Sequence, residues 1–145
     1  MTPTTEFVVR TFEYPGDYPA VAALWDGAGP GVHLGRSDSP PEIEKKLRQD
    51  PDLFLVAEFG GRIVGSIIGG FDGRRGMMYH LAVEPAARNR GIGDALVQEL
   101  ETRLREKGCL RCYLLVVEDN LAAIDFYEKR GFTRLRVYTL AKDLQ

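Results

Sequence analysis

Apolar residues recur every three to four positions between Gly91 and Lys107, and this is the clearest periodic pattern in the chain. Ile92, Leu96, Leu100 and Leu104 fall on one face, while charged residues occupy the other faces. Such a pattern predicts an amphipathic helix that packs against a core. Weaker patterns of the same kind predict three further helices, at residues 17–25, 40–49 and 120–130.

Short runs of β-branched and aromatic residues predict the strands. They lie at residues 6–13, 53–59, 62–71, 77–83, 110–117 and 133–141. The Gly60-Gly61 turn joins two of them into a hairpin, so the first half of the chain is predicted to be a mostly antiparallel meander. The strands before and after the long helix form a βαβ unit, in which both strands run parallel with a right-handed crossover.

A chain of 145 residues with 44% hydrophobic content is long enough for one compact domain, which is expected to span residues 1–145. The order of the elements predicts an α/β (α+β) fold with a mixed, mostly antiparallel central sheet. We expect about six or seven strands, a central parallel pair from the βαβ unit, and about four flanking helices.

Charge and hydropathy exclude several classes of partner. The formal net charge is -2, which provides no general attraction to a phosphate backbone, so nucleic acid is not an expected partner. The first twelve residues lack a signal-peptide pattern, and no stretch approaches the ~20 apolar residues of a membrane span. A soluble, cytoplasmic protein without membrane contact is therefore expected.

Cys109 and Cys112 form a lone C-x-x-C pair. They follow the end of the predicted long helix, whereas a reactive thiol of low pKa is favoured at a helix N-terminus. His33 and His80 do not have the spacing of zinc ligands relative to this pair. We expect no metal and two buried or half-buried thiols.

The most informative segment is the junction at residues 82–93, where a predicted strand passes into the long helix. It contains Arg88, Arg90, Gly91 and Gly93. Unpaired backbone N–H groups and the positive end of the helix dipole meet there, and glycine allows an anion to approach the backbone closely. The segment is not a Walker A loop, because Gly93 is followed by Asp94 and Ala95 and not by Lys and Ser or Thr. It is not a dinucleotide-binding fingerprint, because Leu96 stands where that motif has a small residue. The junction predicts an anion site, although a turn with solvated arginines has the same composition.

A second motif covers residues 120–132, from Asn120 to Phe132. On a helix, Asn120 and Tyr127 share a face about 10 Å apart and look toward the same groove. Each also has an ordinary structural explanation. Asn120 can be a helix N-cap, and Tyr127 can be a half-buried aromatic residue.

Taken together, the two motifs resemble those of the GNAT superfamily of N-acetyltransferases. Arg88, Gly91 and Gly93 match its acetyl-CoA motif, (Arg/Gln)-x-x-Gly-x-(Gly/Ala), and residues 120–132 are similar to its N-x-x-A-x-x-F-Y-x-x-x-G-F signature. The resemblance covers roughly residues 6–141. It extends to bacterial YpeA-type acetyltransferases through residues 53–58, 69–73 and 117–120.

The resemblance implies acetyl-CoA as the co-substrate. In the family, the strand that ends at Val83 binds the pantetheine arm, the amides of residues 89–95 hold the pyrophosphate, and the second motif lies near the sulfur. The implied coenzyme-binding residues are Leu81, Ala82, Val83, Arg88, Asn89, Arg90, Gly91, Ile92, Gly93, Asp94, Ala95, Asn120, Ala123, Phe126 and Tyr127.

The implied reaction is direct acetyl transfer to a primary amine of a small molecule or a peptide. A neutral nitrogen attacks the thioester, a backbone N–H near Leu81 or Val83 polarises its oxygen, and Tyr127 acts as general acid. A lysine-like amine costs roughly 4 to 5 kcal/mol to deprotonate at neutral pH, so a strongly basic acceptor requires an enzyme base. Some relatives carry a glutamate where this chain has Leu115.

Four residues are candidates for that base, namely Glu118, Asp72, Tyr79 and His80. Tyr79 and His80 are neighbours on a predicted strand and are expected to face opposite sides. The acceptor pocket is expected to draw on the first helix, the loop after it and the segment before residue 77. Its candidate residues are Trp25, Asp26, His33, Arg36, Asp72, Arg74 and Tyr79.

Two functions remain open, an acetyltransferase and an acetyl-CoA-binding sensor or pseudoenzyme without turnover. The intact Tyr127 favours catalysis, and the missing glutamate leaves room for the sensor. Dimers are frequent in the family, so the resemblance is also compatible with a homodimer.

Overall fold

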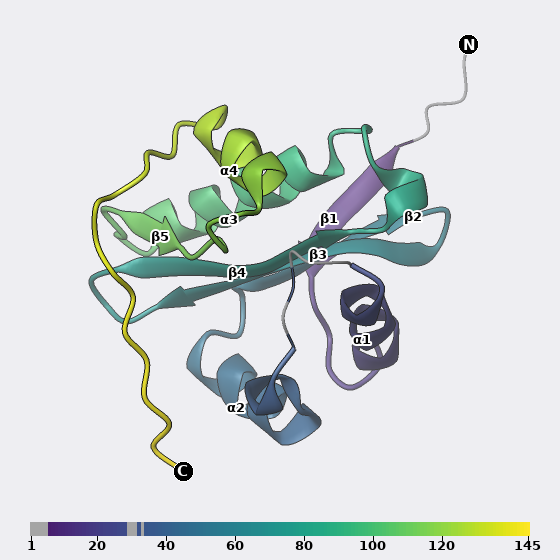
Figure 1. Cartoon of the computed structure of the whole chain (residues 1–145). Coiled ribbons are helices and arrows are strands. Elements are labelled where there is room, and N and C mark those ends of the chain that lie inside the picture. The colour runs from purple at the N-terminus through teal and green to yellow at the C-terminus, as the bar shows by residue number, and fades with distance from the viewer. Residues whose placement is uncertain (1–5, 29–31, 33) are drawn as a thin grey trace.

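The computed structural model describes residues 6–28, 32 and 34–145. These residues form one five-stranded sheet with helices α1 and α2 on one face and helices α3 and α4 on the other (Figure 1). The predicted mixed α/β fold is confirmed. The candidate residue His33 lies outside the described residues.

The sheet has the strand order β1-β2-β3-β4-β5. Its strands are β1 (Phe7–Thr11), β2 (Phe54–Phe59), β3 (Arg62–Phe71), β4 (Gly76–Val83) and β5 (Cys112–Leu114). The first four pair antiparallel in sequence order, whereas β4 and β5 pair in parallel. The predicted hairpin and the predicted parallel pair are therefore both present, but the parallel pair lies at the edge of the described sheet and not at its centre.

The helices begin and end close to the predicted positions. They are α1 (Tyr18–Asp26), α2 (Pro40–Gln49), α3 (Ile92–Glu106) and α4 (Leu121–Glu128), with short 3₁₀ turns η2 (Arg36–Asp38) and η3 (Pro85–Ala87). Helix α3 connects the parallel strands β4 and β5 and buries its apolar stripe against the sheet. Since both faces of the sheet are covered, the interior strand β2 is buried over four consecutive residues.

Glycines in the sheet bring α3 unusually close to it. A methyl group on Gly65 would lie 3.0 Å from Ile92 and 3.1 Å from Leu96, and one on Gly69 would lie 2.5 Å from Leu100. The apolar side chains of α3 thus lie in a shallow groove over Gly65 and Gly69, which larger residues would fill. We call this groove the glycine track. This track fixes the height and direction of the helix above β3 and β4.

Strand β4 contains a bulge that the sequence pattern does not reveal. Ser66 of β3 pairs with Ala82 and Ile68 pairs with Tyr79, so His80 and the residue after it oppose a single residue of β3. His80 takes a left-handed backbone conformation with φ 49°, which is uncommon for a residue with a side chain. Tyr79 and His80 consequently both face the α1 and α2 side, and the prediction that they face opposite sides is wrong.

The last two predicted strands are shorter than expected or absent. The strand predicted at 110–117 spans only Cys112–Leu114, and the strand predicted at 133–141 does not form. Among the described residues, β5 has a strand neighbour on one side only, so its ends lack a ladder to hold them. Residues 133–145 are exposed throughout and run past the edge of the sheet as an extended segment (Figure 1).

The glycine track makes a stability prediction. Replacing Gly69→Ala should lower the free energy of unfolding by about 1 to 3 kcal/mol, because the new methyl group collides with the buried Leu100 side chain. Gly70→Ala is the matched control on the other face of β3, where the nearest atom, the Lys46 Nζ, is 3.4 Å away. Urea unfolding followed by circular dichroism measures both. Equal effects at the two positions would contradict the role of the track.

Candidate functional site

The turn before α3 presents unpaired backbone N–H groups. Asn89 and Gly91 have positive φ values of 65° and 81°, and Gly91 caps the helix. The first helical hydrogen bond runs from the Ala95 N–H to the Gly91 carbonyl at 3.0 Å, so the preceding amides of α3 have no helical acceptor. At the N-terminus of a 15-residue helix, these amides add to the positive end of the dipole. The turn has the properties of an anion site.

The two arginines of the turn are exposed and held in place. Arg88 donates from Nε to the Val83 carbonyl at 3.2 Å, and the Arg90 guanidinium lies 5.0 Å from the ring centre of Phe59. Both side chains therefore remain at the surface beside the turn and add positive charge to it.

Asp94 places a carboxylate in the first turn of α3, and Arg130 neutralises it. The two side chains form an ion pair at 2.8 Å between Arg130 Nε and Asp94 Oδ1. Arg130 also stacks on Phe126 at 3.6 Å, and the Phe126 ring lies 3.3 Å from the position of a methyl group on Gly93. Helix α4 is thereby tied to the turn before α3. The sequence motifs do not single out Arg130, because its partner is 36 residues away.

Strands β4 and β5 separate beside this turn. Their parallel pairing covers Gly76 to Met78 on β4, and β4 then continues to Val83 without β5. The β4 backbone from Leu81 to Val83 therefore has, among the described residues, no strand neighbour on its β5 side. Its polar groups on that side are available to an extended, amide-containing ligand.

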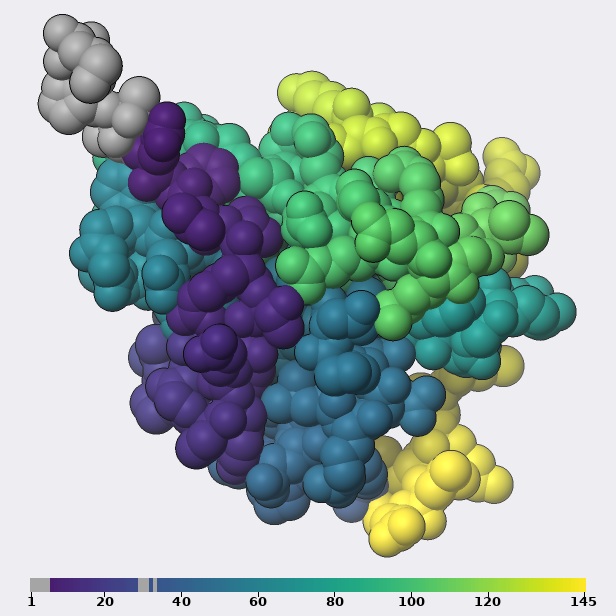
Figure 2. Space-filling view, turned by 180° about the vertical axis from the view of Figure 1, so that it is seen from behind, coloured from purple at the N-terminus to yellow at the C-terminus, as the bar shows by residue number. Residues whose placement is uncertain are grey.

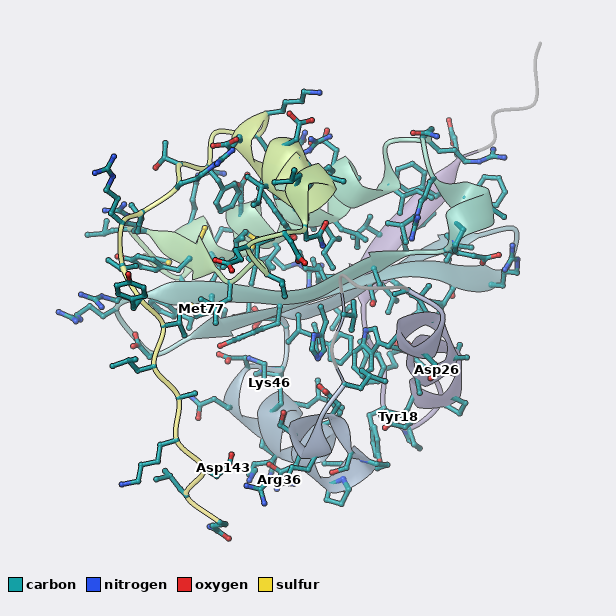
Figure 3. The ribbon with its side chains drawn as sticks, in the orientation of Figure 1. Tyr18, Asp26, Arg36, Lys46, Met77 and Asp143 are labelled. Carbon is teal, nitrogen blue, oxygen red and sulfur yellow. The ribbon has the colours of Figure 1, made fainter. Side chains whose placement is uncertain are left out.

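A cavity of about 1310 Å³ is lined by Met77 and Tyr79 of β4 and by the residues of β5, but by none of residues 81–95. Its walls come from the C-terminal end of α2, strands β3 to β5, helix α4 and the C-terminal segment. Lys46 points from α2 up toward the sheet (Figure 3) and lines the cavity from the face opposite to α4. Of the candidate residues, the cavity brings together Asp72, Tyr79, Glu118 and Tyr127.

Tyr127 is the most perturbed of these groups. Burial raises the pKa of its phenol to about 12. The ring packs between Phe126 and Phe132, with centroid distances of 5.1 Å and 5.5 Å. The hydroxyl group is therefore protonated at neutral pH and can act as a proton donor to a group in the cavity.

Asn120 caps α4. Its Oδ1 accepts a hydrogen bond from the Ala123 N–H at 3.2 Å, which is the N-cap arrangement. The residue thus has a structural role in orienting the helix that carries Tyr127. A contact between Asn120 and a coenzyme remains a prediction.

A polar cluster that the sequence motifs do not indicate lies across the cavity. Lys46 Nζ pairs with the Asp50 Oδ2 at 2.6 Å, and Asp50 is only 6% exposed. The Tyr79 hydroxyl lies close to this pair. A methyl group on Gly70 would lie 3.4 Å from the Lys46 Nζ and 3.8 Å from the Tyr79 hydroxyl oxygen. Burial, and then the Asp50 charge, raise the pKa of Tyr79.

The remaining base candidates have other partners. His80 donates from Nε2 to Asp38 Oδ1 at 2.7 Å and packs against Trp25 at 5.1 Å between ring centroids. Asp72 accepts hydrogen bonds from two backbone amides of its own turn, which hold the pKa of its carboxyl below its usual value. Glu118 is exposed and lines the cavity.

The structure separates most of the acceptor-pocket candidates from the cavity. Trp25 is a core residue, 2% exposed, whose indole N–H donates to the Ser66 hydroxyl at 3.1 Å. Asp26 is exposed at the end of α1, Arg74 is exposed in the turn after β3, and Arg36 contacts the C-terminal segment. Among the members of this group that the structure describes, only Tyr79 and Asp72 line the cavity.

Metal and redox chemistry find no support in the described part of the chain. It contains no group of three or more potential metal ligands. As a separate finding, none of the helices in this part has the length and apolarity needed to cross a membrane. Cys109 and Cys112 are free and half-buried, and burial raises the pKa of the Cys112 thiol. A raised pKa disfavours the reactive thiolate.

Three comparisons place the chain among known proteins. The family model described as "Acetyltransferase (GNAT) family" matches residues 18–132. An acetyltransferase of Pectobacterium atrosepticum is 48% identical over 88% of this chain and 89% of its own, and one of Yersinia enterocolitica is 43% identical over 94% of both. The PaiA N-acetyltransferase of Thermoplasma acidophilum, solved with coenzyme A, superposes with a TM-score of 0.78 at 21% identity over 92% of this chain and 93% of its own.

The polar cluster across the cavity predicts a change in tyrosine ionisation. Asp50→Asn should lower the pKa of Tyr79, because it removes a negative charge beside the phenol and leaves the Lys46 ammonium without its partner. Spectrophotometric titration at alkaline pH measures the shift, and the same titration of Tyr79→Phe identifies the signal. An unchanged Tyr79 titration would show that Asp50 and the phenol are not electrostatically coupled.

Proposed function

Because the chain belongs to the acetyltransferase (GNAT) family, we propose that it transfers an acetyl group from acetyl-CoA to a primary amine by direct attack in a ternary complex. The observation that carries this proposal is the turn at Gly91, where unpaired amides at the start of α3 lie beside the opening between β4 and β5. A diphosphate and an extended pantetheine arm need these two features side by side.

The coenzyme half of the site is assigned to the α3 turn and β4. Amides of residues 89–95 would hold the pyrophosphate, with Arg88 and Arg90 at its rim. The free edge of β4 at Leu81 to Val83 would accept the pantetheine amides as a strand neighbour would. When bound, acetyl-CoA supplies the activated acetyl group as a thioester.

Tyr127 is assigned the role of general acid. It lines the cavity on α4, the helix tied to the anion turn through Phe126 and Arg130. The phenol carries its proton at neutral pH and would donate it to the departing sulfur, so that CoA leaves as the free thiol. The intact phenol in the cavity favours an enzyme over a sensor without turnover.

Glu118 is assigned the role of base, acting through water. Of the four candidates, Tyr79 is held protonated by its surroundings, Asp72 is engaged in its turn, and His80 is engaged with Asp38. Glu118 is exposed, lines the cavity and can accept a proton from a solvated acceptor amine. The Lys46, Asp50 and Tyr79 cluster forms the opposite wall, where the body of the acceptor would lie.

We expect the ion pair between Asp94 and Arg130 to affect the affinity for CoA. Arg130→Met should weaken CoA binding about three- to tenfold, because the released Asp94 carboxylate competes for the positive helix end and repels the phosphates. Adding Asp94→Asn should restore most of the lost affinity. Isothermal calorimetry with CoA measures both. If the double variant binds no better than the single one, the loss came from packing and not from charge.

The proposed general acid predicts a separation of binding from turnover. Tyr127→Phe should reduce the rate of thiol release from acetyl-CoA by about 10² or more, while CoA affinity changes less than about threefold. Thiol release is measured over a panel of amines that includes α-amino acids, peptides, polyamines and aminoglycosides.

The same panel tests the function itself. CoA binding without release on any amine would favour a sensor, and the absence of CoA binding by correctly folded protein would refute the acetyltransferase proposal. With Tyr127 as sole acid, activity should not fall between pH 8 and 10 through its ionisation, since its pKa is about 12.

A further inference from the structure

We propose that Asp38 and His80 are positioning residues for coenzyme binding, because the hydrogen bond between them holds the backbone of β4 in the conformation that turns Leu81 and Val83 toward the coenzyme. This inference rests on the proposed function, which assigns the coenzyme to the free edge of β4. Three observations carry it. They are the direction of the backbone hydrogen bonds along β4, the conformation of His80, and the contacts of its imidazole.

The backbone hydrogen bonds change side along β4. The Gly76 N–H donates to the Arg111 carbonyl at 3.0 Å, on the β5 side, whereas the Glu84 N–H donates to the Val64 carbonyl at 2.8 Å, on the β3 side. In a regular strand the N–H groups of successive residues point alternately to the two sides, so residues an even number apart point to the same side. Gly76 and Glu84 are an even number apart but point to opposite sides. The extra residue of the bulge therefore reverses the alternation.

This reversal decides which backbone groups face the coenzyme. Because Glu84 points toward β3, the alternation places the N–H and C=O groups of Leu81 and Val83 on the other side of β4. Among the described residues β4 has no strand neighbour there, and the coenzyme is assigned to that side. If the alternation from Gly76 continued unbroken, Ala82 would face the coenzyme, and Leu81 and Val83 would face β3.

The bulge requires an unfavourable conformation of His80. Its φ of 49° lies in the left-handed region, which glycine adopts freely and a residue with a side chain does not. Among the described residues, the only other positive φ outside glycine belongs to Asn89. A conformation of this kind persists only where the surrounding contacts hold it.

The His80 side chain has such contacts on two sides. Its Nε2 lies 2.7 Å from Asp38 Oδ1, and its ring packs edge-on against Trp25 with 5.1 Å between the centroids. The hydrogen bond is shielded from water, since the side chains of His80 and Asp38 are 18% and 12% exposed. Trp25 is fixed in turn through the Ser66 hydroxyl.

Asp38 is a fixed partner for the imidazole. Its Oδ2 accepts a hydrogen bond from the Gly35 N–H at 2.8 Å, and its carbonyl accepts one from the Tyr18 hydroxyl of α1 at 2.9 Å. The segments that contain α1 and α2, coloured purple to blue, adjoin one another in the space-filling view (Figure 2). Asp38 ends the turn η2 that lies between these helices in the chain. The loop after α1 thus controls, through one hydrogen bond, the backbone that meets the coenzyme.

Glycine and alanine at position 80 separate positioning from packing. His80→Ala removes the imidazole but keeps a side chain at a positive φ, so the apparent affinity for CoA should fall about fivefold or more as the bulge ceases to be the major conformation. His80→Gly also removes the imidazole, but glycine adopts this φ freely, so its affinity should stay within about twofold of the wild type. Calorimetry with CoA measures both. A packing role alone predicts the reverse order, because glycine leaves more empty space and weakens a strand. A glycine variant that binds no better than the alanine variant overturns the proposal.

Asp38→Ala tests the partner of the imidazole. It should weaken CoA binding about as much as His80→Ala does, but by less than about twofold when it is added to His80→Gly, which has no imidazole to hold. Tyr18→Phe is the matched control, because it removes another hydrogen bond to Asp38 without touching the imidazole, and it should change the affinity less than about twofold. Equal losses from Asp38→Ala in the two backgrounds contradict the proposed role.

The bulge can also be observed without a ligand. Nuclear Overhauser contacts between the backbone protons of Ser66 and Ala82, which pair across the ladder, should be present in the wild type and in His80→Gly and weaken in His80→Ala and Asp38→Ala. If the wild type binds no CoA but these contacts depend on His80, the proposed function fails and the hold of His80 on the bulge stands. If CoA binds but the contacts persist in both alanine variants, the positioning role fails and the proposed function stands.

Discussion

The close contact between α3 and the sheet is the constraint on which the rest of the structure depends. Ile92, Leu96 and Leu100 lie on Gly65 and Gly69 at distances that no larger residue in the track would allow. The contact fixes where α3 begins, and therefore where its unpaired amides point. Because β4 runs under the same helix, the end of β4 and the start of α3 are held together at the opening between β4 and β5.

The second helix of this face is attached to the first at the same place. Gly93 admits the Phe126 ring, and Asp94 binds Arg130, so α4 joins α3 within its first turn. Tyr127 follows Phe126 directly and turns toward the cavity. The turn before α3 and the phenol are thereby parts of one rigid unit. Under the proposed function, Tyr127 must meet one end of a long coenzyme while the turn holds the other end, and this requires a fixed spacing between the two.

Local patterns were sufficient to predict most of this face. The period of the apolar residues in α3, the hairpin glycines and the βαβ order all depend on neighbours in sequence. Each of these elements formed at its expected place, although β5 is shorter than expected. Local patterns did not predict the bulge at His80, because a one-residue insertion in a strand ladder depends on the partner strand. The Lys46 and Asp50 pair beside Tyr79, and the Asp94 and Arg130 pair, likewise arise from tertiary packing. Trp25, in contrast, was predicted to line the acceptor pocket but is a buried core residue.

The track beneath α3 also limits how the length of this helix can change. Each residue adds about 100° of rotation, so the loss of one residue would turn every later side chain away from the track. Three or four residues together, close to one full turn, would nearly restore the alignment. Evolution of this domain by insertion is therefore expected in the exposed turns at residues 60–61 and 72–75, where added residues leave the helix in its seat.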